Sequence, residues 1–143
     1  MIKRGQYTLL EVVAAIAILV LVLGVTTVSF GNLRLEKSPL EQVQSLRRMA
    51  ALCRRSAVAQ GKAQSISYVH EQRTIRFGNE NMILPETMRL TVNAKVPEDD
   101  LEIISFFPDG NSTESVIEIS CDGETAGLTV SPLTGVMDVY EKE

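Results

Sequence analysis

The chain has 143 residues and a formal net charge of -4, and 22% of its residues are charged. This mild acidity gives no sign of a charged polymer as a partner for the whole molecule. The chain has two cysteines without a Cys-x-x-Cys pair and one histidine, His70, in a stretch typical of a solvated hairpin turn. These residues supply too few ligands for a zinc site and too few groups for a nucleophile with its base. We therefore expect no enzyme, no metal and no cofactor.

The N-terminal part is strongly apolar. Glu11 follows a basic start and precedes an uncharged run from Val12 to Phe30. About 20 residues at a rise of about 1.5 Å span a bilayer, whereas the apolar core of a secretory signal is about 7 to 15 residues long. The run predicts a transmembrane helix over 7–31 after a leader over 1–6. Basic residues stand on both sides, so charge alone leaves the orientation open.

Glu11 is a carboxylate at the edge of this run. Moving it into lipid costs about 2 to 3 kcal/mol, which normally indicates a specific partner. It could equally lie at the headgroup level, near the positive end of the helix dipole.

An amphipathic helix is predicted within 32–61. Pro39 can occupy its first turn with Ser38 as its cap, and Gly61 stops it. Its apolar residues recur every three or four positions and form one core-facing side. They are Val43, Leu46, Ala50, Cys53 and Ala57.

Four arginines repeat with seven-residue spacing on an adjacent side of this helix. They are Arg47, Arg48, Arg54 and Arg55. Such a stripe could bind anions, either acidic neighbours or nucleic acid. We favour the alternative of a solvated helix face.

After Gly61 the apolar period changes to two, which is typical of strands. Residues 66–68 and 75–77 predict a β-hairpin around the His70 turn. Glycine- and proline-bearing turns separate the later candidate strands. These are 88–92, 103–107, 116–121, 128–130 and 136–140. The acidic loop 97–100 offers oxygen ligands for calcium, but its spacing is not that of an EF-hand and favours a solvated turn.

The pattern predicts an α+β fold. A long N-terminal helix, transmembrane in its first half, packs its second half on an antiparallel β-sheet domain over 62–143.

The residues at the start of the apolar run form a motif. Lys3-Arg4-Gly5 precedes Tyr7-Thr8-Leu9-Leu10-Glu11 and the apolar helix. This resembles the leader of type IV pilins and type II secretion pseudopilins, in which a glycine is followed by Phe-Thr-Leu-Ile-Glu. The resemblance implies that a prepilin peptidase cuts the leader on the cytoplasmic side and methylates the new amine. It also implies that Glu11 pairs with the terminal amine of a neighbouring subunit.

The motif departs from that family by one residue, because Gln6 separates Gly5 from Tyr7. Cleavage after Gly5 makes Glu11 the sixth mature residue, and cleavage after Gln6 makes it the fifth. We favour cleavage after Gly5, since access of the peptidase to a small residue should matter more than a shift of one position.

Two C-terminal segments add a second resemblance. They are Phe107-Pro108-Asp109-Gly110-Asn111-Ser112-Thr113 and Val130-Ser131-Pro132-Leu133-Thr134-Gly135-Val136. They are similar to the end of GspH/FimT-like minor pseudopilins, in which such turns join the closing strands.

The resemblance implies a structural minor pseudopilin of a type II secretion system. Its partners would be the prepilin peptidase, other pseudopilins and the bacterial inner membrane, crossed once with the C-terminal domain in the periplasm. An alternative is a minor pilin of a type IV pilus or competence system that binds DNA through the arginine stripe. A third is a periplasmic domain that stays anchored and never assembles.

Cys53 and Cys121 are both predicted to face the core. In an oxidising periplasm they could form a disulfide, and the alternative is two buried thiols.

Overall fold

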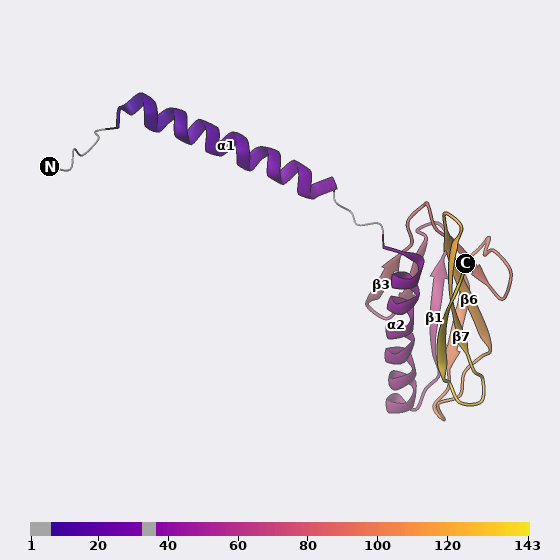
Figure 1. Cartoon of the computed structure of the whole chain (residues 1–143). Coiled ribbons are helices and arrows are strands. Elements are labelled where there is room, and N and C mark those ends of the chain that lie inside the picture. The colour runs from indigo at the N-terminus through magenta and orange to yellow at the C-terminus, as the bar shows by residue number, and fades with distance from the viewer. Residues whose placement is uncertain (1–6, 33–36) are drawn as a thin grey trace. The chain divides into compact units, whose positions relative to one another are not determined.

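The computed structural model describes residues 7–32 and 37–143, with side chains over 7–22 and 37–143. The chain divides into two units, Met1–Glu36 and Lys37–Glu143 (Figure 1). The expected leader over 1–6 lies outside the described residues.

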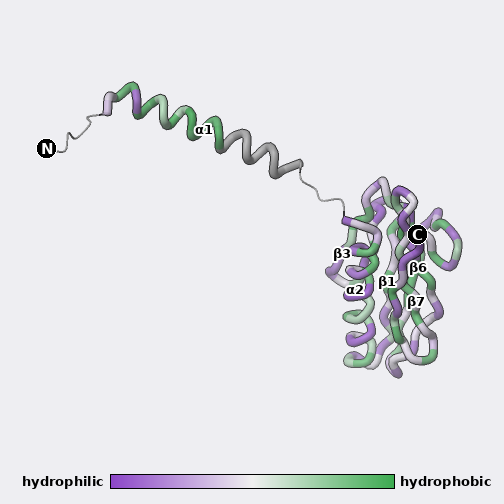
Figure 2. Tube along the Cα trace, viewed as in Figure 1, coloured by the Kyte–Doolittle hydropathy of each residue, from purple (hydrophilic) through white to green (hydrophobic). Residues whose placement is uncertain are grey.

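Helix α1 (Leu9–Asn32) is the element of the first unit. It begins after Thr8, whose carbonyl accepts hydrogen bonds from the backbone N–H of Glu11 at 3.0 Å and of Val12 at 3.2 Å. In Figure 2 the coloured part of α1 is mostly hydrophobic, with a hydrophilic band near its start. Across residues 7–32 and 37–143, no helix meets the length and apolarity that a membrane span requires.

Helix α2 (Pro39–Gln60) opens the second unit with the predicted caps. The Ser38 hydroxyl accepts a hydrogen bond from the backbone N–H of Glu41 at 3.3 Å, and Pro39 occupies the first turn, where no N–H is needed. Gly61 ends the helix in the left-handed conformation, at φ 63°. The helix predicted within 32–61 is thus observed over 39–60, and residues 33–36 lie outside the described ranges.

Sheet A has the order β3-β2-β1-β5 and is antiparallel throughout. Its strands are β1 (Gln64–Val69), β2 (Thr74–Phe77), β3 (Glu80–Ile83) and β5 (Leu101–Phe106). The predicted hairpin around the His70 turn is confirmed by the β1–β2 pairing.

Strand β3 was not predicted. Gly78 and Asn79 form the two-residue turn that lets Phe77 pair with Glu80. Gly78 has a φ of 56°, and Gly-Asn is a recognised hairpin signal. The signal was missed because β3 buries Met82 alone and so shows little alternation.

Sheet B has the order β4-β6-β7-β8 and is also antiparallel. Its strands are β4 (Arg89–Val92), β6 (Ser115–Cys121), β7 (Glu124–Val130) and β8 (Met137–Lys142). All four overlap predicted strands, and β7 begins four residues before the predicted strand 128–130.

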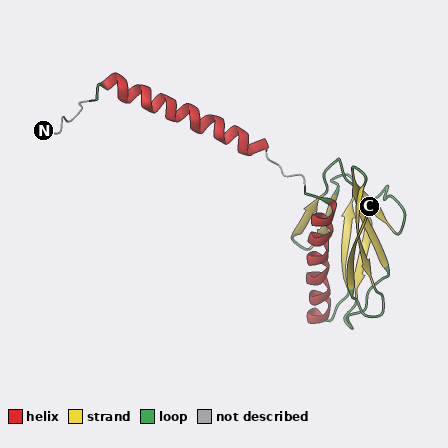
Figure 3. Cartoon of the chain, in the orientation of Figure 1, coloured by secondary structure: helices red, strands yellow, loops and turns green. Residues whose placement is uncertain are grey.

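Helix α2 packs on both sheets, touching β1 and β5 of sheet A and β6, β7 and β8 of sheet B (Figure 3). Its five predicted core residues are all fully buried. They meet buried aliphatic and aromatic residues of the strands, including Ile66, Phe106, Ile117 and Leu128. The α+β class is confirmed, but the single predicted sheet is two sheets. Alternation predicts which residues face a core and leaves open which strands pair.

Candidate functional site

The start of α1 holds the predicted assembly residue. Glu11 lies in the first turn, and its backbone N–H also donates to the Thr8 hydroxyl at 3.3 Å. Its side chain is exposed, near the positive end of the helix dipole. Tyr7 is exposed, whereas Gly5 and Gln6 lie outside the described residues.

The described surface of α1, over residues 9–22, is apolar and exposed. Every described side chain from Tyr7 to Val22 is exposed, and Glu11 is the one charged residue in the sequence of α1. The large exposed side chains include those of Leu9, Leu10, Ile16, Ile18, Leu19 and Leu21. A continuous apolar surface of this kind indicates burial in another phase or against another molecule.

The predicted arginine stripe divides into two kinds of residue. Arg54 is half-buried, and its guanidinium donates to the backbone carbonyls of Gly110 at 3.2 Å and Thr134 at 3.0 Å. It therefore ties α2 to the two C-terminal turns that the sequence analysis singled out. The close approach explains Gly135, where a Cβ would lie 2.4 Å from the Gly110 carbonyl oxygen.

The other three arginines, Arg47, Arg48 and Arg55, are exposed. Arg48 donates to the Ser45 hydroxyl at 3.0 Å, a contact on its own helix. An anion-binding stripe would thus rest on three residues and not on four, because the Arg54 guanidinium is engaged inside the fold.

A polar cluster crosses the outer face of sheet B. Glu118, Gly127 and Tyr140 lie directly opposite one another on β6, β7 and β8. The Tyr140 ring covers Gly127, where a Cβ would come within 2.3 Å of it, and its hydroxyl donates to the Glu118 carboxylate at 2.8 Å. Lys142 forms an ion pair with the same carboxylate at 2.5 Å.

The surroundings of this cluster shift the pKa values of Glu118 and Tyr140 in opposite directions. The hydrogen bonds from Lys142 and then Tyr140 hold the pKa of Glu118 below its usual value. Burial, followed by the bond to Glu118, raises the pKa of Tyr140 to about 12. Glu118 therefore stays ionised and Tyr140 stays neutral across neutral pH, as expected of a brace between strands.

No family model matches the chain, and no curated protein sequence does. A solved structure resembles it: the minor pseudopilin EpsH from the Type 2 Secretion System of Vibrio cholerae, with a TM-score of 0.58 and 14% sequence identity. The match covers 73% of this chain and 97% of EpsH. This chain has a pilin-like fold. At this identity the likeness extends to the fold alone.

The two cysteines of this pilin-like domain are not joined by a disulfide. Cys53 is fully buried, and burial raises its pKa to about 12. The turn after Cys121 lies beside Ser38–Leu40, at the start of α2.

The His70 turn and the acidic loop meet each other. The backbone N–H of His70 donates to the Asp100 carboxylate at 2.8 Å. In the described part of the chain, no three His, Cys, Asp or Glu side chains gather into a metal-binding group. Asp100 thus joins the acidic loop to the His70 turn through this hydrogen bond.

Sequence reasoning missed two structural contacts. The Gly127–Tyr140 packing had a signal, since a glycine inside a strand often marks a close approach. Arg73 had none: its φ is 47°, and its guanidinium donates to the carbonyls of Pro85, at 3.1 Å, and Met88. It fastens the β1–β2 turn to the segment before β4.

Proposed function

We propose that this chain is a structural minor pseudopilin of a type II secretion system. In this proposal α1 crosses the bacterial inner membrane once, and residues 37–143 stand in the periplasm. The observation that carries it is the pilin-like fold, matched over almost all of EpsH. The exposed, nearly uncharged α1 and the leader-like residues before it support the same role.

The proposed mechanism is assembly. The prepilin peptidase cuts after Gly5 or Gln6 and methylates the new amine, and α1 then packs against the helices of sibling subunits. In an apolar surrounding the Glu11 carboxylate requires a positive partner, which the terminal amine of a neighbouring subunit supplies. The resulting periplasmic filament helps to export folded proteins.

Glu11→Gln tests this mechanism against a matched control. Glu11 and Glu41 are both exposed acids in the first turn of a helix, so Glu41→Gln removes the same charge from α2. In native membranes, we expect Glu11→Gln to lose cross-linking to the other pseudopilins and to reduce secretion, while Glu41→Gln retains both. Equal assembly of the two variants would contradict the role of Glu11.

A minor pilin that binds DNA is the second candidate, because Arg47, Arg48 and Arg55 are exposed on one helix. It predicts a DNA mobility shift at low ionic strength that weakens steeply with salt. The Arg47→Gln/Arg48→Gln/Arg55→Gln variant should abolish the shift. Absence of any shift by the unmodified chain at low salt would remove this candidate.

A further inference from the structure

Strand β8 presents a free edge. It is the last strand of sheet B, and among the described strands it pairs with β7 alone. One row of its backbone N–H and C=O groups therefore points away from the sheet, and such an edge can template another strand.

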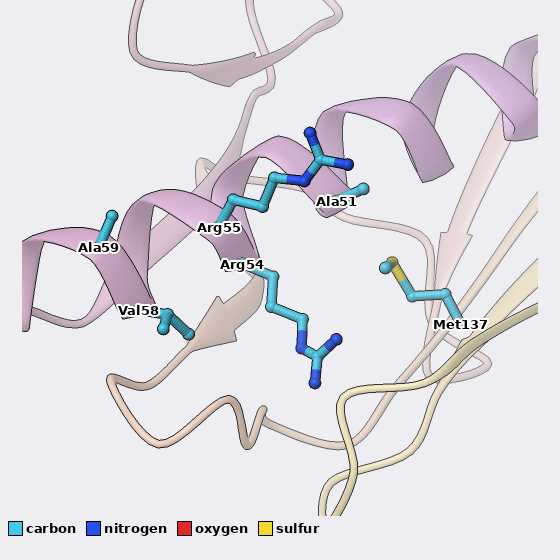
Figure 4. A pocket seen from close by; sticks show the side chains of 6 residues that line it. All are labelled: Ala51, Arg54, Arg55, Val58, Ala59 and Met137. Carbon is cyan, nitrogen blue, oxygen red and sulfur yellow. The ribbon is translucent and has the colours of Figure 1, made fainter.

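A groove of about 510 Å³ lies beside the start of this edge, between α2 and β8. It is lined by Ala51, Arg54, Arg55, Val58, Ala59 and Met137. In Figure 4, Met137 and Arg54 project into the space between the helix and the C-terminal strand. Val58 is 52% exposed there, and the neighbouring Val136 is 50% exposed. The edge is thus bordered by apolar surface with arginines at its rim.

The side chains of β8 alternate between two faces. Asp138, Tyr140 and Lys142 lie on the outer face, because Tyr140 covers Gly127 there. Met137 and Val139 pack toward the core on the other face. Asp138 is exposed, and the Lys142 side chain is 61% exposed. Asp138 and Lys142, which carry opposite charges, therefore lie two positions before and two positions after Tyr140.

We propose that a second copy of this chain adds its β8 to this edge, antiparallel, with Tyr140 opposite Tyr140 of the second copy. In that register Asp138 lies opposite Lys142 of the second copy, and the two-fold axis repeats the pair. Opposite charges directly across a ladder are stabilising and like charges are destabilising. Such a contact is isologous and closes at two copies.

The charges select this register over its neighbours. Centring the pair on Asp138 places two aspartates opposite each other, centring it on Glu141 two glutamates, and centring it on Lys142 two lysines. Centring it on Val139 forms no ion pair. The charged residues thus oppose most registers of the edge and favour the one centred on Tyr140.

The groove adds a second complementarity. With Tyr140 at the centre, Glu143 of the second copy lies opposite Met137, which lines the groove together with Arg55. An acidic strand end from another copy therefore meets the basic rim.

Charge reversal tests the pairing in the full-length protein in detergent, by sedimentation velocity. Asp138→Lys and Lys142→Asp each place like charges across the edge, so each variant should weaken self-association by about tenfold or more. An equal mixture of the two variants restores both ion pairs and should form the mixed dimer. Glu114→Lys, an exposed reversal away from the edge, is the control and should associate like the unmodified chain.

Any association through α1 persists in all variants, so only the β8 contact follows the charge pattern. Far-UV circular dichroism verifies that each variant is folded. An unmodified chain that stays monomeric at every concentration would overturn the proposal. So would single reversals that associate normally, or folded variants whose mixture stays monomeric. The pairing does not depend on leader cleavage, so its failure leaves the proposed function untouched.

Discussion

Helices α1 and α2 have nearly equal lengths, 24 and 22 residues, and opposite relations to solvent. All described side chains of α1 are exposed although nearly all are apolar, whereas α2 buries one whole side against two sheets. The apolar residues of α2 stabilise its own unit. The described apolar side chains of α1 bury nothing within their own unit. In the proposed function the first helix carries assembly, whereas the second carries the fold.

The largest expected effect is a difference in unfolding free energy when the same substitution, leucine to alanine, is made in each helix. Leu46→Ala empties a fully buried position of α2 and should cost about 2–5 kcal/mol of unfolding free energy. Leu19→Ala on α1 is the control, because Leu19 is 59% exposed, and should leave that free energy within about 0.5 kcal/mol. Urea unfolding of the full chain in detergent measures both. Similar losses in the two variants would contradict the division.

Gly127→Ala should cost about 1–3 kcal/mol, because the new Cβ displaces the Tyr140 ring. In a Tyr140→Ala background the same substitution should cost far less, since the obstructing ring is absent. Urea unfolding of the four chains gives the coupling energy. Additive losses would mean that the close packing is not the cause.

Arg54→Met should cost about 1–3 kcal/mol, because the carbonyls of Gly110 and Thr134 lose their charged donor. Arg55→Met is its matched control on the next position of the helix and should change stability by less than about 0.5 kcal/mol. Thermal unfolding compares the two. Equal losses of stability in the two variants would mean that the Arg54 hydrogen bonds do not stabilise the fold and that Arg54 behaves like the exposed arginines.

The smallest expected effect is on the pH dependence of stability. Because the pKa of Glu118 is lowered in the fold, its contribution is present above its unfolded pKa, about 4.3, and is lost as the pH falls through the folded value. Its partner Lys142 is 61% exposed, so solvent screens the ion pair and we expect less than about 1 kcal/mol. The stability difference between the unmodified chain and Glu118→Gln should therefore shrink on acidification. A difference that is constant from neutral to acid pH would exclude this origin.

Much of the second unit could be predicted because local rules act there. Ser38, Pro39 and Gly61 bound α2 by capping chemistry, and period-two alternation located seven of the eight strands. What escaped depends on contacts between distant residues. Seven-residue spacing places Arg54 beside three exposed arginines, but only the fold brings Gly110 and Thr134 to it. The packing of Tyr140 on Gly127 likewise requires the β7–β8 register.

The central claim is that α1 belongs to a processed subunit that assembles. Mass spectrometry of the protein from its native membrane, on the intact chain and on its N-terminal fragment, tests this most directly. We predict loss of the residues through Gly5 or Gln6 with one methyl group on the new amine, which also fixes the mature position of Glu11. A full-length, unmodified terminus in cells with an active prepilin peptidase would contradict assembly and leave α1 as a simple anchor.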